Sequence, residues 1–255
     1  MRLTKQDFSD IQAHIDLTRK QLGEHGLTLH VDHDMHAFVD YIGRQEETHG
    51  VPSSHNPAKC YLHPGNSFWV YVRHTASGDI IGCQAQRLMV TDDFVQDCLA
   101  QTLFENLTPS LDAPPLGADD SVRVLIAGRV MYGGGLYIRP DWRSKGLLIF
   151  NRVSRTIALR HFQADYFCGL QLNTQRRRAM ALTGFAFAHV VPFIQGGLPG
   201  KPHADDVQLS WSSRQEWLEA IRRELANQDA GRYTPRRTRA PIDPLREAAA
   251  AGTRA

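Results

Sequence analysis

The sequence predicts a mixed α/β fold in which a central sheet is flanked by helices. Residues 122–172 read as a strand, a helix and a second strand, and such a crossover unit makes the two strands parallel neighbours. Helical patterns stand at both ends of the chain, with β-rich stretches between them. The chain has 255 residues, of which 42% are hydrophobic, so it can bury a substantial core. We expect one domain over residues 1–227.

The first half is expected to combine helices with one hairpin. Apolar residues spaced three or four apart predict helices, whereas runs of β-branched and aromatic residues predict strands. Ser77, Gly78 and Asp79 are typical of a hairpin turn. The predicted elements, in order, are helices at 8–22 and 35–43, a hairpin at 68–90, a helix at 92–107 and a loop at 109–121. Residues 1–66 are therefore expected to form a helical N-terminal part.

Three consecutive glycines, Gly133 to Gly135, interrupt the strand predicted at residues 122–138. Glycines inside a strand mark a bulge, or a place where another backbone or a ligand comes close. The elements predicted after this strand are a helix starting near Gly146, a strand at 164–172, a helix from Asn173 to Thr183 that Gly184 caps, strands at 185–194 and 205–211, and a helix at 213–225 with Ser213 as its N-cap.

The C-terminal segment, residues 228–255, is basic. It holds six Arg against three acidic residues, contains Pro and many small residues, and shows no apolar periodicity. Such a composition predicts a disordered tail.

The formal net charge of the chain is only +2, which is too small to indicate a nucleic-acid partner. The first residues lack the apolar stretch of a signal peptide, and no apolar run approaches the roughly 20 residues that span a bilayer. The four cysteines are far apart and form no CxxC pair, so neither a disulfide framework nor a zinc ribbon is indicated. We expect a cytoplasmic protein with neither a nucleic-acid nor a membrane partner.

A short basic turn lies between the strand that ends at Ile138 and the helix after it. Residues 143–146 stand where the backbone N–H groups and the positive dipole end of that helix point outward, which suits a phosphate. Gly146 lets a bulky anion approach the main chain, and Arg143 and Lys145 add positive charge. The Walker pattern and the G-x-G-x-x-G dinucleotide pattern are both absent. The alternative is an ordinary solvated basic turn.

The same turn resembles the central motif of the GNAT superfamily of acyl-CoA-dependent N-acyltransferases, V/I-x-P-x-x-R/Q-x-x-G-x-G/A. The residues that match are Ile138, Pro140, Arg143 and Gly146, while Leu148 stands where the family has Gly or Ala. A second family motif, N-x-x-A-x-x-x-Y-x-x-x-G-F, follows at a suitable distance. Its matches are Asn173, Gly184 and Phe185, with Arg176 and Met180 in the Ala and Tyr positions.

The resemblance implies a GNAT-like sheet whose central strands splay apart, acetyl-CoA or another acyl-CoA as co-substrate, and no metal. It implies transfer of an acyl group, most simply acetyl, to an amine acceptor that attacks the thioester directly. Residues 1–66 would border the acceptor site, and residues 67–227 would bind acyl-CoA, with the glycines forming a bulge beside the acyl group and the pyrophosphate over residues 143–148. The implied acyl-CoA-binding residues are Tyr137, Ile138, Arg143, Ser144, Lys145, Gly146, Leu147, Leu148 and Asn173.

The leaving thiolate needs an acid, and the family often takes it from the Tyr position that is Met180 here. A thioether cannot donate a proton. The candidate acids are nearby tyrosines, Tyr132, Tyr137 and Tyr166. No Asp or Glu lies between Val122 and Ile138, where a family base is often found, so deprotonation through water or by a distant group such as His189 is expected. The missing Tyr also supports an alternative, a CoA-binding protein without catalysis.

A polar cluster follows the first predicted helix, and its members are His30, Asp32, His33, Asp34 and His36. Three interpretations stay open. The imidazole and carboxylate groups could bind a metal ion, as in a metal-dependent hydrolase. Asp32 or Asp34 could instead cap the helix at 35–43, leaving the histidines exposed. The cluster could also line the acceptor pocket, where acidic groups would favour a cationic amine.

Overall fold

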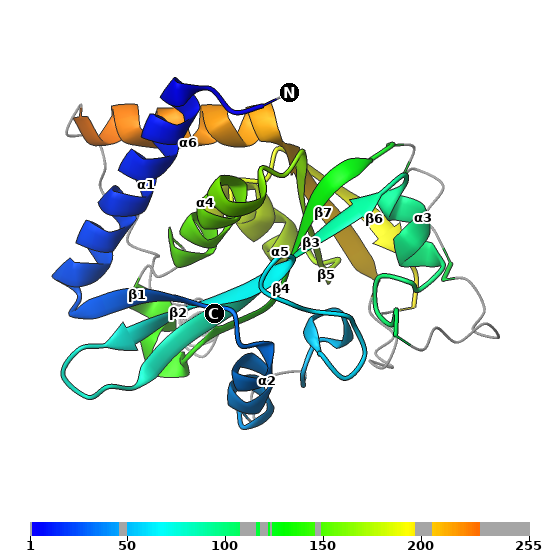
Figure 1. Ribbon diagram of the computed structural model, residues 1–255, viewed down its shortest axis with the longest axis horizontal. Coiled ribbons are helices and arrows are strands. Elements are labelled where there is room, and N and C mark those ends of the chain that lie inside the picture. Colours follow the sequence, from blue (N-terminus) through cyan, green and yellow to red (C-terminus); the bar gives the residue numbers. More distant parts are fainter. Residues whose placement is uncertain are drawn as a thin grey trace, which may run out of the picture.

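A seven-stranded sheet forms the centre of the protein (Figure 1). The structure, a computed structural model, describes residues 2–45, 50–107, 116–117, 122, 124–145, 149–196 and 206–229. The strands follow the order β1-β2-β3-β4-β5-β7-β6, in which β4 and β5 are parallel and the other neighbours are antiparallel. Their bounds are β1 Leu27–Asp32, β2 Ser67–His74, β3 Ile80–Thr91, β4 Gly128–Ile138, β5 Tyr166–Leu172, β6 His189–Ile194 and β7 Val207–Ser213.

Helices cover both faces of this sheet. Their bounds are α1 Lys5–Glu24, α2 Met35–Gly43, α3 Phe94–Leu99, α4 Ile149–Phe162, α5 Gln175–Ala179 and α6 Arg214–Asp229, with 3₁₀ helices η1 Ser53–His55 and η2 Pro140–Lys145 and a π-helical turn η3 Met180–Gly184. The predicted mixed α/β fold with a flanked central sheet is confirmed. Within the described ranges, no helix is long and apolar enough to cross a membrane.

The division between the faces follows from the alternation of side chains along each strand. On β2, Phe68 and Val70 pack in the core cluster that contains residues of α1, α4 and α6. Trp69, between them, packs with Phe38 of α2 on the opposite face. Figure 1 shows α1, α4 and α6 together on one side of the sheet and α2 on the other. The two N-terminal helices therefore do not form one helical unit.

The predicted parallel pair of strands is present, and it is short. β4 and β5 pair over four residues, and the last pair is Gly133 opposite Gly169. Each strand then continues, β4 to Ile138 and β5 to Leu172, while it stays paired on its outer side with β3 or β7. The two central strands therefore separate beyond the glycine pair, which gives the sheet the splay that the family resemblance implies.

The glycine run forms the predicted bulge in β4. The register with β3 shifts between Cys83 opposite Tyr137 and Ala85 opposite Gly134, so β4 holds an extra residue there. Gly135 has φ +60°, a left-handed conformation that favours glycine over every other residue.

Two of these glycines also make room for side chains on the α2 face. A Cβ atom on Gly134 would lie 2.6 Å from the ring of His55. A Cβ atom on Gly135 would lie 2.5 Å from the ring of Phe38 and 3.3 Å from Pro52. On this face the close approach expected at the glycines is made by the protein's own α2 and η1 segments.

The strand β1 is absent from the predicted elements. Leu27, Leu29 and Val31 alternate with polar residues, and this two-residue period is typical of a strand. The strand pairs with β2 from Leu27 to Asp32 and forms one edge of the sheet. The prediction of a helical N-terminal part is therefore wrong at this segment.

The helix predicted at residues 92–107 is much shorter. Asp93 caps its start by accepting hydrogen bonds from the N–H groups of Val95 and Gln96 at 3.0 and 3.2 Å. The helix ends at Leu99, and Gln101 has φ +65°, which no α-helix accommodates. Similarly, β4 begins at Gly128, well after the predicted start at residue 122.

The helix predicted from Asn173 to Thr183 changes its geometry part-way. Beyond Ala179 it widens into the π-helical turn η3, in which the Phe185 N–H donates to Met180 O at 2.8 Å. The predicted capping role of Gly184 is wrong, because Phe185 occupies the C-cap. Ala186 then has φ +54°, so the strand predicted from residue 185 begins only at His189.

The cap predicted for the last helix is present. Ser213 Oγ accepts from the Glu216 N–H at 3.3 Å, and the Glu216 carboxylate accepts from the Ser213 N–H at 2.8 Å, so the two residues form a reciprocal capping box. The helix continues to Asp229, two residues into the segment expected to form the tail. The remainder of that segment lies outside the described residues.

We expect Gly135→Ala to lower the free energy of unfolding by about 3 kcal/mol, because the new methyl group would add a left-handed strain of about 1 kcal/mol to a clash with Phe38. Gly78→Ala is the matched control, since Gly78 also has positive φ, +76°, but no atom within 4 Å of its Cβ position. Urea unfolding of both variants measures the difference. Equal losses would show that contact with Phe38 does not constrain the bulge.

Candidate functional site

The candidate site begins at the edge of the sheet where β4 and β5 both end. Because the two strands are parallel, the segments that follow them lie at the same edge, which is where ligands bind in open α/β sheets. η2 follows β4 and carries the exposed Arg143, and α5 follows β5 and carries the exposed Arg177 and Arg178. Three exposed arginines from two segments therefore follow the ends of the splayed strands.

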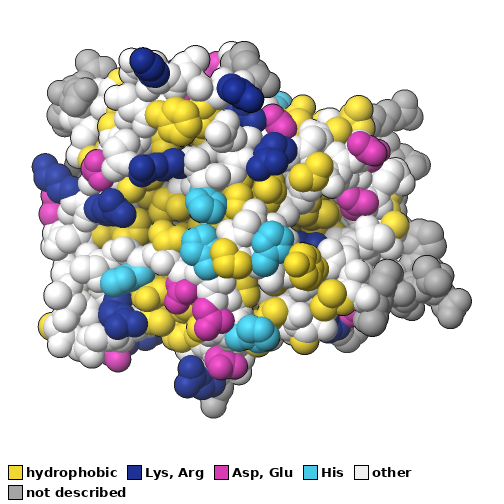
Figure 2. Space-filling view, viewed as in Figure 1, with side chains coloured by type: hydrophobic (Ala, Val, Ile, Leu, Met, Phe, Trp, Pro, Cys, Tyr) yellow, Lys and Arg dark blue, Asp and Glu magenta, His cyan; other side chains and the backbone are white. Residues whose placement is uncertain are grey.

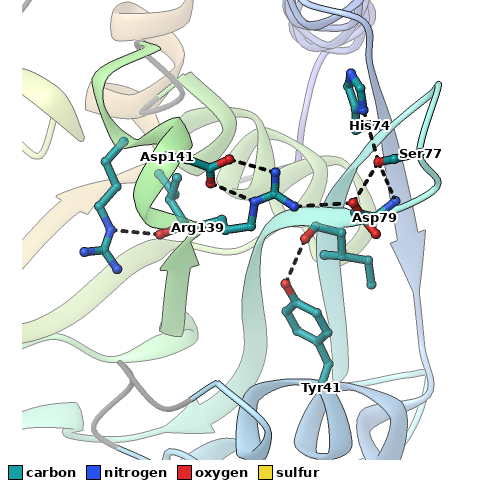
Figure 3. A network of polar contacts seen from close by, with 9 residues as sticks. Tyr41, His74, Ser77, Asp79, Arg139 and Asp141 are labelled. Atoms are coloured by element: carbon teal, nitrogen blue, oxygen red, sulfur yellow. Dashed lines mark hydrogen bonds and ion pairs between the residues drawn. The ribbon is translucent and has the colours of Figure 1, made fainter.

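Arg139 fixes the turn at the end of β4. Figure 3 shows its guanidinium group between Asp141 of η2 and Asp79 of the β2–β3 hairpin. Two hydrogen bonds, of 2.7 and 2.8 Å, join Arg139 to the Asp141 carboxylate, and a third of 3.4 Å reaches Asp79. The Asp141 carboxylate raises the pKa of Arg139. Arg139 therefore anchors η2, and its charge is already neutralised by protein carboxylates.

Arg143 lies one turn further along η2. Its Nε–H donates to Ile138 O, the last carbonyl of β4, at 2.9 Å. This hydrogen bond folds the side chain back over the end of the strand while the residue stays exposed to solvent. Tyr137 is buried on the α2 face, and Ile138 is half-buried on the α4 face.

The remaining predicted acyl-CoA-binding residues are only partly described. Ser144 and Lys145 belong to η2, and residues 146–148 lie outside the described residues. Asn173 directly follows β5, where its N–H donates to Asp206 O at 2.7 Å. Thr174, the next residue, caps α5 by accepting from the Arg177 N–H at 3.1 Å. The structure thus brings Tyr137, Ile138, Arg143 and Asn173 to one edge of the sheet.

A buried ring of hydrogen bonds lies against the bulge on the α2 face. His55 Nε2 is 3.2 Å from Tyr132 O, and His55 Nδ1 is 3.0 Å from Ser54 Oγ. The Tyr132 hydroxyl is hydrogen-bonded to Ser54. The rings of His55 and Tyr132 are also stacked, with centroids 5.4 Å apart. We call Ser54, His55 and Tyr132 the buried triad.

The chemistry of these groups fixes every proton in the buried triad. A carbonyl oxygen can only accept, so His55 Nε2 carries a proton. Burial, with a smaller effect from the nearby Arg87, lowers the pKa of His55 to about 3, so its ring is neutral and Nδ1 accepts from Ser54. Ser54 has one hydroxyl proton, and it is used there. The Tyr132 phenol must therefore donate to Ser54, which closes the ring with every polar atom satisfied.

Arg87 holds this ring in place from β3. Its Nη1 donates to Ser54 O at 3.1 Å, to Leu103 O at 2.8 Å and to Cys60 Sγ at 3.2 Å. Burial raises the pKa of the Cys60 thiol. Sequence reasoning missed Ser54, His55 and Arg87. The only signal was a charged residue inside the apolar strand at 80–91, which is unusual for a buried strand unless the charge has partners.

The three candidate tyrosines occupy different places. Tyr132 belongs to the buried triad, where burial raises the pKa of its phenol and its proton is directed to Ser54. Tyr166 is the first residue of β5, three residues before Gly169, where the parallel pairing ends. At the rise per residue of a β-strand, three residues span roughly 10 Å. Tyr137 alone of the three lies in the part of β4 beyond the last β4–β5 pair.

The residues of the His/Asp cluster point in different directions. Asp34 caps α2 by accepting from the His36 and Ala37 N–H groups at 2.9 and 3.1 Å. His30 stacks on Tyr71 with ring centroids 4.9 Å apart. Among the residues that the structure describes, no three His, Cys, Asp or Glu are grouped so that they could hold a metal ion. The capping interpretation is therefore confirmed for Asp34.

A different grouping of histidines is visible on the surface. In Figure 2 histidine side chains gather in the middle of the face, against hydrophobic side chains, with acidic groups directly below them. Among the described histidines, His33 lies close to His161: its Nδ1 is 3.1 Å from Ser67 O, and its ring centroid is 5.4 Å from that of His161. The sequence-distant His161 replaces His30 and His36 as the neighbour of His33.

Two further residues of interest have structural roles. Met180 is half-buried and begins the π-helical turn, where it packs against the core cluster of the α4 face. His189 Nε2 is 2.7 Å from Glu216 Oε1, and its ring stacks on Trp211. His189 therefore connects the edge strand β6 to the start of α6.

Comparison with known proteins gives similarity in structure only. No protein-family model matches the sequence, and no curated protein does. The chain is similar to the crystal structure of Arabidopsis thaliana NAA60 in complex with acetyl-CoA, at 10% identity, with 74% of this chain and 99% of that chain covered and a TM-score of 0.45.

Two further solved structures are similar at the same level. The spermidine N-acetyltransferase from Vibrio cholerae in complex with CoA and spermine has 10% identity, covers 76% of this chain and 98% of that chain, and gives a TM-score of 0.41. The ribosomal-protein-S5-alanine acetyltransferase from Vibrio fischeri has 11% identity and a TM-score of 0.37. The match to the latter covers 59% of this chain and 63% of that chain.

We expect the stability of the protein to fall as the pH falls from about 6.5 toward 3, because His55 is held neutral in the fold and the unfolded chain takes up its proton first. The folded-state pKa lies below the unfolded value, so this contribution is complete above pH 6.5 and is lost on acidification. Between pH 6.5 and 4 the loss should be about 3 kcal/mol. Urea unfolding of wild type and His55→Gln across this range measures it.

His55→Gln should be less stable throughout but should lack this part of the pH dependence. His36→Gln, a change at an exposed histidine of the same N-terminal region, should keep the wild-type slope. Identical slopes for wild type and His55→Gln would show that His55 is not a buried neutral group.

Proposed function

We propose that the protein is an acyl-CoA-dependent N-acyltransferase. The observation that supports this most directly is the separation of β4 from β5 beyond Gly133 and Gly169. Strand edges that face each other without pairing leave backbone amide groups that seek hydrogen-bond partners. An extended ligand with its own amide groups can bind such an edge as an added strand does. Pantetheine, a linear chain with two amides, has this form.

The charge at the edge of the sheet suits the other end of the same ligand. Arg143, Arg177 and Arg178 come from the segments after β4 and β5. Guanidinium groups bind phosphate oxygens in a bidentate manner, and CoA carries its phosphates at the end of the molecule away from the thiol. A CoA molecule would then run from this cationic edge inward between the two strands. The acyl group would lie near the glycine pair.

The reaction we propose is direct transfer of the acyl group to an amine. The neutral amine attacks the thioester carbonyl carbon, a C–N bond forms, and the C–S bond breaks. The nitrogen loses a proton and the departing CoA thiolate gains one. Backbone N–H groups near the bulge are suited to stabilise the oxyanion that forms on the carbonyl oxygen.

We propose Tyr137 as the acid that protonates the thiolate. The proton of Tyr132 is committed to Ser54, and Tyr166 is placed before the strands separate. Tyr137 is on the separated part of β4, next to the end of the strand where Arg143 lies. Met180 has no role in proton transfer, since its thioether packs in the core.

We expect the protein to bind CoA, and Arg143→Glu to weaken this binding about tenfold or more, because the substitution replaces a charge that attracts phosphate with one that repels it. Arg160→Glu is the matched control, since Arg160 is an exposed arginine in the last turn of α4, away from the cationic edge. Isothermal calorimetry with CoA measures both. Equal affinities of the two variants would refute the placement of the phosphates.

We expect release of free thiol from acyl-CoA in the presence of a panel of amines, and Tyr137→Phe to lower kcat about 100-fold with unchanged CoA affinity, as the loss of a general acid does. Tyr166→Phe should leave kcat nearly unchanged. Full activity of Tyr137→Phe would exclude it as the acid. CoA binding by wild type without turnover of any amine would favour the alternative of a non-catalytic CoA-binding protein.

A further inference from the structure

A buried polar surface lies under α4 where β4 and β5 separate. The row of facing residues across four strands at this point is Gln86, Gly133, Gly169 and Ser210. The two glycines place no side chain in the middle of the row. A Cβ atom on Gly133 would lie 3.3 Å from the Gln86 amide, so this amide lies directly over the glycine.

Arg155 of α4 lies above the same row. Its guanidinium carbon is 4.2 Å from the ring centroid of Phe187 and 4.1 Å from that of Trp217, so the group is enclosed between two aromatic rings. Phe187 is also the side chain that a Cβ atom on Gly169 would meet, at 3.4 Å. Arg155 is therefore connected through one ring to the last β4–β5 pair, although the residue is only 3% exposed.

Several buried polar atoms of this surface have no hydrogen-bond partner among the described residues. We call Gln86, Arg155, Gln171 and Gln208 the amide–guanidinium cluster, and Gln171 faces Gln208 in the next row of the sheet. The buried atoms in it without a hydrogen-bond partner are Gln86 Oε1, Arg155 Nε and Nη1, Gln171 Oε1, and Gln208 Oε1 and Nε2. Buried polar atoms are nearly always satisfied in folded proteins, and each exception costs about 1–3 kcal/mol. So many unpartnered donors and acceptors on one surface suit a polar ligand.

The charge of the cluster indicates what that ligand carries. Arg155 makes one weak hydrogen bond, from Nη2 to Asn151 Oδ1 at 3.4 Å. Glu224 acts on Arg155 through space; its Oε2 accepts from Arg152 at 3.0 Å, while its Oε1 has no hydrogen-bond partner among the described residues. Two guanidinium groups therefore share one carboxylate, and among the described residues the positive charge of Arg155 has no carboxylate hydrogen-bonded to it. A neutral pantetheine amide would satisfy the glutamines and would leave this charge uncompensated.

We propose that the acyl group of the co-substrate ends in a carboxylate, which binds Arg155 and the glutamine amides of the cluster. The preferred donor is then a dicarboxylic acyl-CoA such as succinyl-CoA instead of acetyl-CoA. The inference rests on the proposed acyltransferase function and specifies its substrate class. The distal carboxylate is unchanged by the reaction, in which only the thioester C–S bond breaks, so its role is to select and position the donor.

The test is calorimetric titration of the wild-type protein with CoA, acetyl-CoA and succinyl-CoA. We expect succinyl-CoA to bind at least about tenfold more tightly than acetyl-CoA, as a desolvated charge-assisted contact provides. Equal affinity for the two thioesters would overturn the inference and leave the acyltransferase function standing. Failure of all three ligands to bind would instead refute the proposed function itself.

Three variants make the assignment specific. Arg155→Met should abolish the preference while CoA affinity is retained, and Arg160→Met, the same change at an exposed position of α4, should keep it. Gln208→Leu is a second, separate variant that keeps the test valid if Arg155→Met does not fold. Its amide has no partner among the described residues, so an apolar replacement of similar size should not destabilise the fold, yet it should reduce the preference about threefold or more. If both Arg155→Met and Gln208→Leu keep the wild-type preference for succinyl-CoA over acetyl-CoA, the inference is overturned. If Arg155→Met does not fold, an unchanged preference in Gln208→Leu overturns it.

Discussion

The end of the pairing between β4 and β5 is the constraint on which the other features depend. Both strands are central, and each keeps a paired neighbour on its outer side, β3 for one and β7 for the other. They can therefore separate beyond Gly133 and Gly169 while each strand stays paired on its outer side. A sheet that remained fully paired would offer no internal strand edge to a ligand. The separation converts the middle of the sheet into a place for an extended molecule.

The polar side chains near the glycines differ in hydrogen bonding between the two faces of the sheet. On the α2 face, Phe38, Pro52 and His55 pack directly on the glycines of the bulge, and the buried triad satisfies all of its own polar atoms. On the α4 face, the amides and the guanidinium group near the glycine row have several atoms without a partner among the described residues. A polar group with every partner present holds a fold together, whereas one without partners imposes a cost that a bound ligand can remove. Whether its polar atoms have hydrogen-bond partners within the protein distinguishes a structural polar cluster from one that binds a ligand.

Sequence alone predicts the local features of this fold well. The crossover unit, the bulge at Gly133 to Gly135 and the caps at Asp34 and Ser213 each depend on a few neighbouring residues, and each is present. Apolar and polar residues alternate clearly in the segment of β1, but its position between two helical patterns favours the prediction of a loop that connects two helices. The failure at Gly184 has another origin. The π-helical turn that moves the cap to Phe185 is set by packing, which no spacing rule describes.

The candidate site resists prediction because it is assembled across long stretches of chain. His55 and Tyr132 meet although 77 residues separate them, and their contact depends on the register of β4, which the bulge shifts. The sequence of α4 does not predict the burial of Arg155, for another reason. A helical pattern is recognised by its apolar positions, so a charged residue between Ser154 and Thr156 reads as solvent-facing, whereas the rings of Phe187 and Trp217 enclose it.

The same enclosure explains why a charge is tolerated at this depth before any ligand binds. The aromatic faces carry partial negative charge and partly offset the loss of water around the guanidinium group, but they leave its N–H groups unpaired. A ligand carboxylate would supply those hydrogen bonds and a directly bonded counter-charge together. Burial would then strengthen the contact, because the low polarity that makes an unpaired Arg155 costly makes a paired one more favourable. Selectivity for the donor thus arises because the unpaired N–H groups of Arg155 cost free energy, and a ligand carboxylate removes that cost.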